Sequence, residues 1–220
     1  MGLIQWDKDL LVKLNSYHNE FWDGFMWMAT DEIFWIPFFA SILYVIYKTK
    51  GKEFFLSLLA ITLTIVICDQ VSGIFKDWIA RPRPSREIDI MDQLHIVNNY
   101  RGGKYGYFSA HAANTFGIAV LISLMIKHWL VTTVLLLWAA LESYTRIYLG
   151  VHYPLDIITG IAFGSIVAYG LYRLHNFLAF RLNFKSIKDA KPPVGVLLFV
   201  FISTIFMLLT GSKAISDFLL

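Results

Sequence analysis

Charged residues and cysteine are both scarce in this chain, and each shortage excludes a class of protein. Asp, Glu, Lys and Arg make up 16% of the 220 residues and hydrophobic residues make up 57%. The chain is therefore far more apolar than an average soluble domain. This composition indicates an integral membrane protein. The single cysteine, Cys68, lies in an apolar run and excludes an intrachain disulfide framework. The net charge of +3 is small, and we expect the lipid bilayer as a partner and no nucleic acid.

Residues 1–30 are predicted to form an amphipathic helix that lies on the membrane interface. Charged residues between Asp7 and Glu20 fill one side of this helix, which is too charged to cross a bilayer. No basic region followed by an apolar stretch and a small-residue cleavage site opens the chain, so we expect no cleaved signal peptide. The other side of the predicted interfacial helix holds apolar residues at helical spacing, which are Leu10, Leu11, Leu14, Tyr17, Phe21 and Phe25.

Six apolar segments follow, of about the length that a helix needs to cross a bilayer. They predict a single all-α domain over residues 1–220, an integral membrane bundle of about six transmembrane helices. In the fifth segment, the spacing of Gly160 and Gly164 predicts close helix packing. The segments are residues 33–47, 54–75, 108–126, 129–148, 154–174 and 194–209.

Lysine and arginine determine the predicted orientation of the bundle. The connections after the first, third and fifth segments carry basic residues around Lys50, at Lys127 and over 173–191, and the positive-inside rule makes their side cytoplasmic. Both termini and the loop 81–107 then face outward. This loop is itself basic, and we interpret its cations as functional residues of an outward-facing active site.

Three polar clusters meet on the outward face of this topology. The first runs from Lys76 to Pro84, the second from Phe108 to His111, and the last from Thr145 to Asp156. Ionisable residues in lipid are costly and indicate a functional site by default. Arginine and lysine gathered around histidine favour phosphate, whose oxygens accept forked guanidinium hydrogen bonds.

The last cluster places a histidine close to a carboxylate. Pro154 suits the first turn of a helix, which puts Asp156 in that turn near His152. The carboxylate would bind the proton of one ring nitrogen and leave the other nitrogen free as nucleophile or base. A helix that starts at Ser109 offers free N–H groups to an anion. No cysteine or tight carboxylate cluster offers itself to a divalent metal, so we expect no metal and no other cofactor.

Three blocks of these residues closely resemble the signature of the type 2 phosphatidic acid phosphatases. Their order and internal spacing both match, over residues 76–156. Two of the blocks depart from the usual pattern. Phe108 and Ala110 stand where the family usually has proline and glycine, and Ala110 narrows the freedom of the backbone. Thr145 replaces a serine but keeps the hydroxyl. The matching residues are Lys76, Arg83 and Pro84, then Ser109 and His111, then Arg146, His152 and Asp156.

The resemblance implies a membrane-embedded phosphatase and a role for each residue. His152 would attack phosphorus and become a phosphohistidine, with Asp156 orienting its ring. His111 would protonate the leaving oxygen and then activate the water that hydrolyses the phosphoenzyme. Fixed cations would replace the usual magnesium of phosphoryl transfer. The residues implied to hold the phosphoryl oxygens are Lys76, Arg83, Ser109, Ala110 and Arg146.

Three further residues lie outside the catalytic and phosphate-binding set. Glu142 precedes Arg146 by four residues, so the two share a helix face. We predict that Glu142 holds Arg146 in place and that Thr145 also supports the site, while the alternative for Glu142 is a structural ion pair alone. Arg81 is off the family register and is predicted to contact a headgroup or the loop.

The choice of substrate stays open among the family's lipids, which include phosphatidate, phosphatidylglycerol phosphate, undecaprenyl pyrophosphate and the phosphates of lipid A. Aromatic residues around an outward site suit a lipid phosphate whose tail stays in the bilayer. The short chain resembles bacterial undecaprenyl pyrophosphate phosphatases, which favours that substrate and an inner membrane location with the site facing the periplasm. The alternatives are a lipid-dependent phosphotransferase and, outside the enzymes, a transporter. The oligomeric state is not determined by the sequence.

Overall fold

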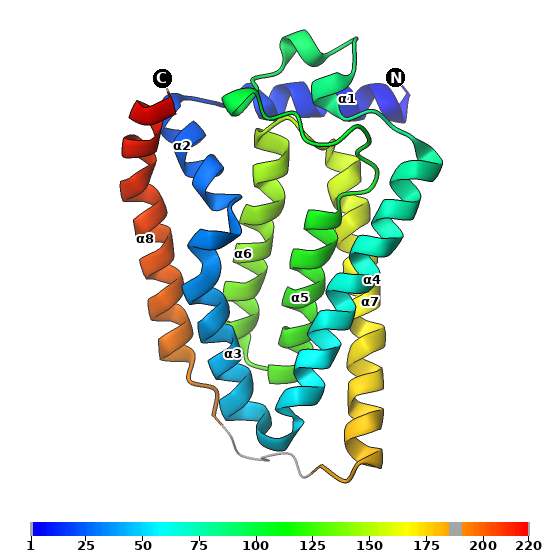
Figure 1. The fold of residues 1–220 in the computed structure, drawn as a ribbon, viewed down its shortest axis with the longest axis vertical. Coiled ribbons are helices and arrows are strands. Elements are labelled where there is room, and N and C mark those ends of the chain that lie inside the picture. Colours follow the sequence, from blue (N-terminus) through cyan, green and yellow to red (C-terminus); the bar gives the residue numbers. More distant parts are fainter. Residues whose placement is uncertain (1, 185–190, 220) are drawn as a thin grey trace.

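The computed structural model describes residues 2–184 and 191–219, with side chains as far as residue 212. Within these ranges the chain is built from helices and loops (Figure 1), and the β-type pairing consists of one isolated bridge between Pro82 and Tyr105. Short 3-10 turns precede α3 and α4 and interrupt the long loop. The helices are α1 (Leu3–Asn15), α2 (Glu20–Ala29), α3 (Ile36–Lys50), α4 (Phe54–Ile79), α5 (Ala110–Ile126), α6 (Trp129–Tyr148), α7 (Pro154–Arg181) and α8 (Val194–Leu219).

Helices α3 to α8 run along the long axis of the molecule, and α1 lies across one end (Figure 1). The α4–α5 loop and the last turns of α8 lie at that same end. The all-α membrane bundle predicted from the sequence is confirmed. The count of six spans requires α3, α4 and the 17-residue α5 to be taken as separate spans. By length and composition, four described stretches are able to cross a membrane: Glu32–Ile79, Trp129–Tyr148, Pro154–Arg181 and Val194–Ser212.

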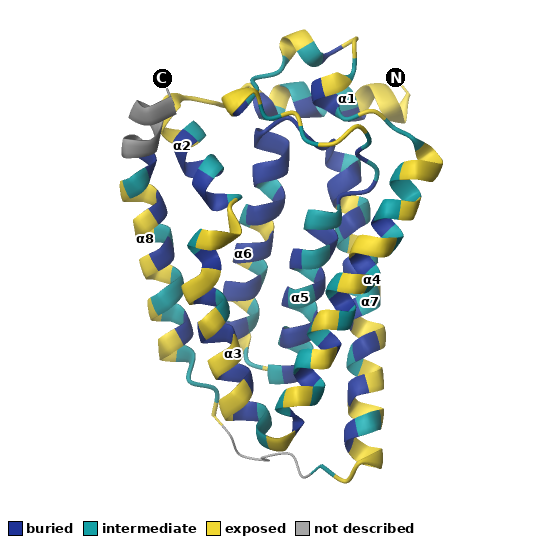
Figure 2. Ribbon diagram, viewed as in Figure 1, coloured by how far each residue is buried: buried dark blue, intermediate teal, exposed yellow. Residues whose placement is uncertain are grey.

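The outer surface of the bundle is largely apolar. Figure 2 shows exposed positions along α4, α7 and α8, whereas much of α5 and α6 is buried. An apolar surface of this extent on a soluble protein would be a liability, and here it suits contact with lipid. The exposed large side chains on these helices include Phe55, Ile166, Phe180, Phe199 and Phe206.

The N-terminal 30 residues form two helices, so the prediction of a single amphipathic helix is wrong. α1 ends at Asn15, whose buried amide donates to the Tyr148 carbonyl (2.7 Å) and accepts the N–H of His95 (2.7 Å). α2 starts after Asn19, which caps the helix by accepting the N–H of Trp22 (3.0 Å), and packs against α8. The break between the helices is therefore fixed by polar contacts that helical spacing does not reveal.

Helices α5 and α7 approach closely in the bundle. A Cβ at Gly160 would collide with the Ser109 carbonyl, and one at Gly164 would collide with the Ala113 carbonyl. The close packing predicted for the glycine pair is confirmed. This approach also sets the start of α5 beside the start of α7, where the Ser109 N–H donates to the Asp156 carbonyl (3.1 Å).

The loop of residues 80–109 covers this end of the bundle. It leaves α4 at Ala80, which has a left-handed backbone conformation (φ 50°). The Arg83 N–H donates to the Lys104 carbonyl (3.3 Å), and the Ser85 N–H donates to the Gly150 carbonyl (3.1 Å). The loop is thereby bound to itself and to the connection between α6 and α7, which carries the last polar cluster.

Candidate active site

A histidine and an aspartate face each other where α7 begins. Pro154 opens α7 and Asp156 lies in its first turn, as predicted. His152 Nδ1 lies 3.3 Å from Asp156 Oδ2, which also accepts the Tyr153 N–H (3.0 Å). Both side chains are buried. Because an ionised carboxylate only accepts hydrogen bonds, the ring proton belongs on Nδ1 and Nε2 keeps its lone pair.

The free nitrogen of this pair faces a cation. Arg83 Nη1 lies 3.3 Å from His152 Nε2, and Arg83 Nε donates to the Tyr105 carbonyl (3.1 Å). Burial lowers the pKa of His152 to about 4; the Asp156 carboxylate opposes this change, and the charges of Arg83 and Arg146 add to it. The imidazole is therefore neutral near pH 7, the state in which Nε2 is able to act as a nucleophile.

Three cations, Lys76, Arg83 and Arg146, act on one another beside the His152–Asp156 pair. Lys76 lies in the last turn of α4, where the charges of Arg83, Arg146 and Asp156 act on it. Burial, and then the charge of Arg146, lower the pKa of the Arg83 guanidinium. Like charges at close range disfavour one another, and a bound anion relieves that repulsion. The arrangement therefore suits a phosphoryl group with several negatively charged oxygens.

Arg146 projects from the last turn of α6 and is held by two hydroxyl groups. Its Nη1 donates to Thr30 Oγ1 (2.6 Å) and its Nη2 to the Tyr100 hydroxyl (3.2 Å). Thr145 Oγ1 donates to the Glu142 carbonyl (2.7 Å) and lies 3.2 Å from Thr30 Oγ1, so Thr145 touches the residue that holds Arg146. Within the described chain Arg146 Nε has no hydrogen-bond partner, so its N–H is available to a ligand.

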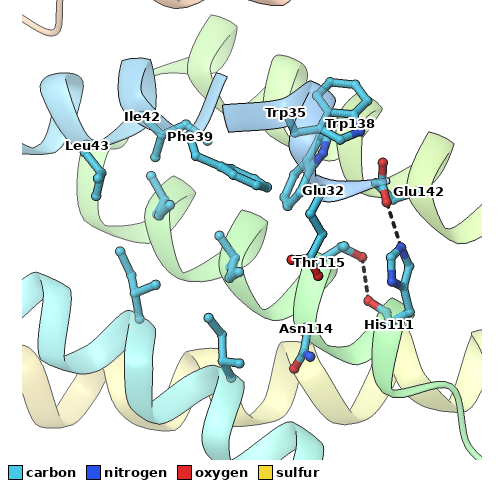
Figure 3. Close-up of a pocket in the computed structure, with 14 residues that line it drawn as sticks. Glu32, Trp35, Phe39, Ile42, Leu43, His111, Asn114, Thr115, Trp138 and Glu142 are labelled. Atoms are coloured by element: carbon cyan, nitrogen blue, oxygen red, sulfur yellow. Dashed lines mark hydrogen bonds and ion pairs between the residues drawn. The ribbon is translucent and has the colours of Figure 1, made fainter. Parts of the chain in front are cut away.

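Glu142 contacts a histidine instead of Arg146. Its Oε2 lies 2.7 Å from His111 Nε2 (Figure 3), and no hydrogen bond or ion pair joins it to Arg146 among the described side chains. The predicted Glu142–Arg146 contact is therefore wrong. The physical reason is competition, because Thr30 and Tyr100 bind the guanidinium while His111 reaches Glu142 from α5. Since the carboxylate binds Nε2–H, Nδ1 is the His111 nitrogen that remains for a substrate.

Ser109 and Ala110 form the start of α5. Ser109 Oγ accepts the N–H of Ala112 (3.3 Å), so this serine is the N-cap, as its position predicts. Ala110 is the first residue of the helix. The first turn of a helix carries unpaired N–H groups and the positive end of the helix dipole, and here it lies next to the buried His152–Asp156 pair.

Arg81 connects this pair to the N-terminal helix. Its Nη1 donates to Asp156 Oδ1 (3.0 Å), its Nη2 donates to Asp7 Oδ2 (2.7 Å), and its guanidinium lies 3.8 Å from the centre of the Tyr153 ring. Asp7 is fully buried and also accepts the N–H of Leu155 (2.9 Å). Arg81 thus belongs to the site itself, and Asp7, which the sequence assigned to the charged side of the interfacial helix, is buried against the bundle. Buried carboxylates require such partners.

Gly106 brings the loop directly over the pair. A Cβ at this position would lie 3.2 Å from Asp156 Oδ2 and 3.7 Å from His152 Nδ1. The sequence does not predict that Gly106 meets this pair, and the glycine-rich composition of 102–106 was the one available signal. The other site residues that the sequence did not identify are Asp7, Thr30, Arg81 and Tyr100.

The acidic side chains of the site are not arranged as metal ligands. Across residues 2–184 and 191–212, no group of three or more His, Cys, Asp or Glu side chains converges in a way that would hold a metal ion. Asp156 is bound to Arg81 and His152, and Glu142 is bound to His111.

Comparison with known proteins places the motif residues in a recognised family. Residues 53–180 match the model of the PAP2 superfamily. The chain is 41% identical over 191 residues to the lipid A 4'-phosphatase of Bacteroides thetaiotaomicron, which covers 85% of this chain and 83% of that protein. It is 35% identical to the lipid A 4'-phosphatase of Porphyromonas gingivalis, over 79% and 74% of the two chains. These relatives do not support the preference for undecaprenyl pyrophosphate drawn from the short chain.

A solved structure shares the fold. The crystal structure of a transmembrane PAP2 type phosphatidylglycerolphosphate phosphatase from Bacillus subtilis matches with a TM-score of 0.59 at 18% identity, over 86% of this chain and 90% of that one. The family match covers more than half of the chain and contains all three sequence blocks. The chain therefore belongs to the PAP2 superfamily and is a membrane-bound lipid phosphatase.

Proposed function

We propose that this enzyme removes a phosphate monoester from a membrane glycolipid of the lipid A class through a phosphohistidine at His152. The observation that carries the proposal is the state of this imidazole, in which Nδ1 is bound to Asp156 and the neutral Nε2 faces Arg83. A nucleophilic nitrogen is thereby presented where a phosphoryl group would pair with fixed cations.

In the first step, His152 Nε2 attacks phosphorus and the bond between phosphorus and the lipid oxygen breaks. The N–H of Arg83 Nη1 gives up its hydrogen bond to Nε2 and donates to a phosphoryl oxygen instead. Lys76 and Arg146 neutralise charge on the other oxygens. The ring of the histidine gains positive charge as the new nitrogen–phosphorus bond forms. Asp156 stabilises that charge through the hydrogen bond to Nδ1.

The leaving oxygen takes its proton from His111. The ring starts with both nitrogens protonated, donates the Nδ1 proton to the lipid oxygen, and keeps its Nε2–H on Glu142. In the second step, neutral His111 accepts a proton from water through Nδ1 while the water oxygen attacks phosphorus. The nitrogen–phosphorus bond breaks, His152 returns to its neutral form, and inorganic phosphate leaves.

The relatives support a glycolipid substrate. Two bacterial proteins that match most of this chain, at 41% and 35% identity, carry the name lipid A 4'-phosphatase. The site lies at one end of helices whose outer surface is apolar, so a substrate held by its tail in the bilayer presents its phosphate at the level of His152. This fit supports a lipid phosphate and not a freely soluble one.

The distribution of charge supports a site on the periplasmic side of the bacterial inner membrane. The α3–α4 hairpin, the α5–α6 turn and the end of α7 lie at the end of the bundle opposite the site (Figure 1). Lys50, Lys52, Lys127 and Arg181 belong to these segments, and the positive-inside rule favours the cytoplasm for them.

The proposal is tested by phosphate release from detergent-purified enzyme in excess chelator, with lipid A, phosphatidate and phosphatidylglycerol phosphate as parallel substrates. We expect release from lipid A that persists in chelator and disappears in His152→Ala. Transfer of the phosphate to another lipid with none to water would identify a phosphotransferase. Activity that depends on added metal, or that survives in His152→Ala, would contradict the proposed mechanism.

A further inference from the structure

A cavity of about 300 Å³ adjoins His111 on the side away from the loop. It lies among α3, α4, α5 and α6, and Figure 3 shows His111 and Glu142 at one end of it. On α5 its lining extends from His111 to Ile122, which corresponds to roughly 16 Å at the helical rise. The rest of the lining is mostly apolar, and includes Trp35, Phe39, Ile42, Leu43, Ile61, Ile65 and Ile118.

Three buried polar atoms in this lining have no hydrogen-bond partner within the described chain. They are Asn114 Oδ1, Trp138 Nε1 and Glu142 Oε1. Asn114 donates through Nδ2 to Asp69 Oδ1 (2.9 Å), and since a carboxylate only accepts, this contact fixes which end of the amide is Oδ1. Trp138 and Glu142 are only 2% and 3% exposed. Buried polar atoms are rarely left unpaired, so these three indicate a ligand.

The unpaired atoms lie close to the catalytic acid. Asn114 is three residues after His111 on α5, and Trp138 is four residues before Glu142 on α6. Each is therefore about one helical turn from the His111–Glu142 pair, on the cavity side. When the phosphate of a lipid lies at His152, a group bound at these atoms belongs to the part of its acyl chain next to the phosphorylated headgroup.

The chemistry of the three atoms restricts the ligand. Asn114 Oδ1 and Glu142 Oε1 are acceptors, and Trp138 Nε1–H is a donor. A hydroxyl or an amide satisfies both kinds at once. The ester groups of a simple glycerophospholipid supply acceptors only, and a polyprenyl chain supplies neither, so both would leave the two acceptors unpaired at a cost in binding.

We propose that this cavity binds an acyl chain of the substrate that carries a hydroxyl or amide group near its head, and that the cavity thereby selects such lipids over those with unsubstituted ester-linked chains. The inference rests on the proposed function, because it assigns the cavity to the substrate of His152. The apolar length of the cavity holds the chain, and the Asn114–Trp138–Glu142 set binds its polar group.

The test compares two glycolipid phosphates whose acyl chains are all ester-linked and that differ only in those chains, one with 3-hydroxyacyl chains and one with plain acyl chains. Trp138→Phe keeps the ring volume but removes the N–H donor. We expect it to lower kcat/KM for the hydroxyacyl substrate roughly two- to tenfold, the range of one neutral hydrogen bond, and to leave the plain substrate unchanged. The matched control is Trp35→Phe, because the Trp35 N–H is already bound to the Ala29 carbonyl (2.8 Å) and its loss does not change selectivity.

Two results would overturn the inference while the proposed function stands: equal hydrolysis of both substrates by the native enzyme, or equal losses on both in Trp138→Phe. Binding is measured separately with His152→Ala, by native mass spectrometry of complexes with the hydroxyacyl and plain lipids. Preferential binding of the hydroxyacyl lipid without any phosphate release by the native enzyme would reject the proposed function but keep the cavity assignment. Equal binding of the two lipids would reject the assignment and leave water as the occupant of the polar end.

Discussion

The Arg81→Gln substitution removes the cation that lies between two buried carboxylates. Arg81 donates to Asp156 at 3.0 Å and to Asp7 at 2.7 Å, and neither acid is exposed. Glutamine is uncharged and too short to reach both. Asp156 then loses its donor on Oδ1 and keeps only the Tyr153 N–H on Oδ2 (3.0 Å), so it orients the His152 ring less firmly and holds the ring proton on Nδ1 less strongly.

The magnitude follows from the bond that is lost. A hydrogen bond to a charged group contributes about 1.5–3 kcal/mol, and a tenfold change in rate corresponds to about 1.4 kcal/mol, so kcat is expected to fall roughly 10- to 150-fold. Removing one partner of a buried ion pair also destabilises the fold by about 3–5 kcal/mol. Turnover is therefore measured per folded molecule, after size-exclusion chromatography and below the Tm of the variant.

Two variants of α1 separate catalysis from the docking of this helix. Asp7→Asn keeps the Arg81–Asp156 bond, so it should lower Tm with a much smaller loss of kcat than Arg81→Gln. Lys8→Gln removes the ion pairs with Glu87 and Asp89 (2.9 and 3.0 Å), which do not touch Asp156, and should leave kcat unchanged. A native kcat in folded Arg81→Gln, or an equal loss in Lys8→Gln, would show that Arg81 does not orient Asp156 for catalysis.

Three further predictions follow from the site and the bundle. Glu142→Gln should slow lipid cleavage in the first turnover roughly tenfold, a part of what a general acid contributes, yet barely affect the first-turnover release of nitrophenol from p-nitrophenyl phosphate, whose leaving group needs no proton; equal first-turnover losses on both substrates would contradict the role of Glu142 at His111. Because burial holds the pKa of His152 at about 4, protonation of the nucleophile should lower kcat/KM only below about pH 4, and a loss that follows its ordinary value of about 6.5 would contradict that. Gly164→Ala should lower the free energy of unfolding by about 1–3 kcal/mol, and with it Tm, because the added Cβ collides with Ala113. An unchanged thermal unfolding curve would contradict the packing.

Residues close in the sequence carried the predictions that the structure confirms. His152, Pro154 and Asp156 lie within one connection and one helical turn, so local geometry alone brings the carboxylate to Nδ1. The spacing of Gly160 and Gly164 likewise places both on one face of α7. In each case the periodicity of a single helix is sufficient.

The unpredicted contacts join distant parts of the chain. Arg81 is 74 residues from Asp7, and Arg146 is 116 residues from Thr30, so their pairing depends on how α1 packs across the end of the bundle and how α2 packs against α6 and α8. The wrong partner for Glu142 has a different cause. Spacing of four residues permits a contact along a helix but does not require it, and His111 on the neighbouring helix binds the carboxylate instead.

The measurement that tests the central role of His152 most directly is isolation of the phosphoenzyme. The enzyme is mixed with p-nitrophenyl phosphate, quenched in alkali within the first turnover, and its peptides are mapped for phosphate. We predict an alkali-stable, acid-labile phosphate on the peptide that contains His152, absent from His152→Ala and accumulating in His111→Ala, where its hydrolysis is slowed. A burst of nitrophenol without phosphate on any peptide, or with phosphate on a different residue, would contradict it.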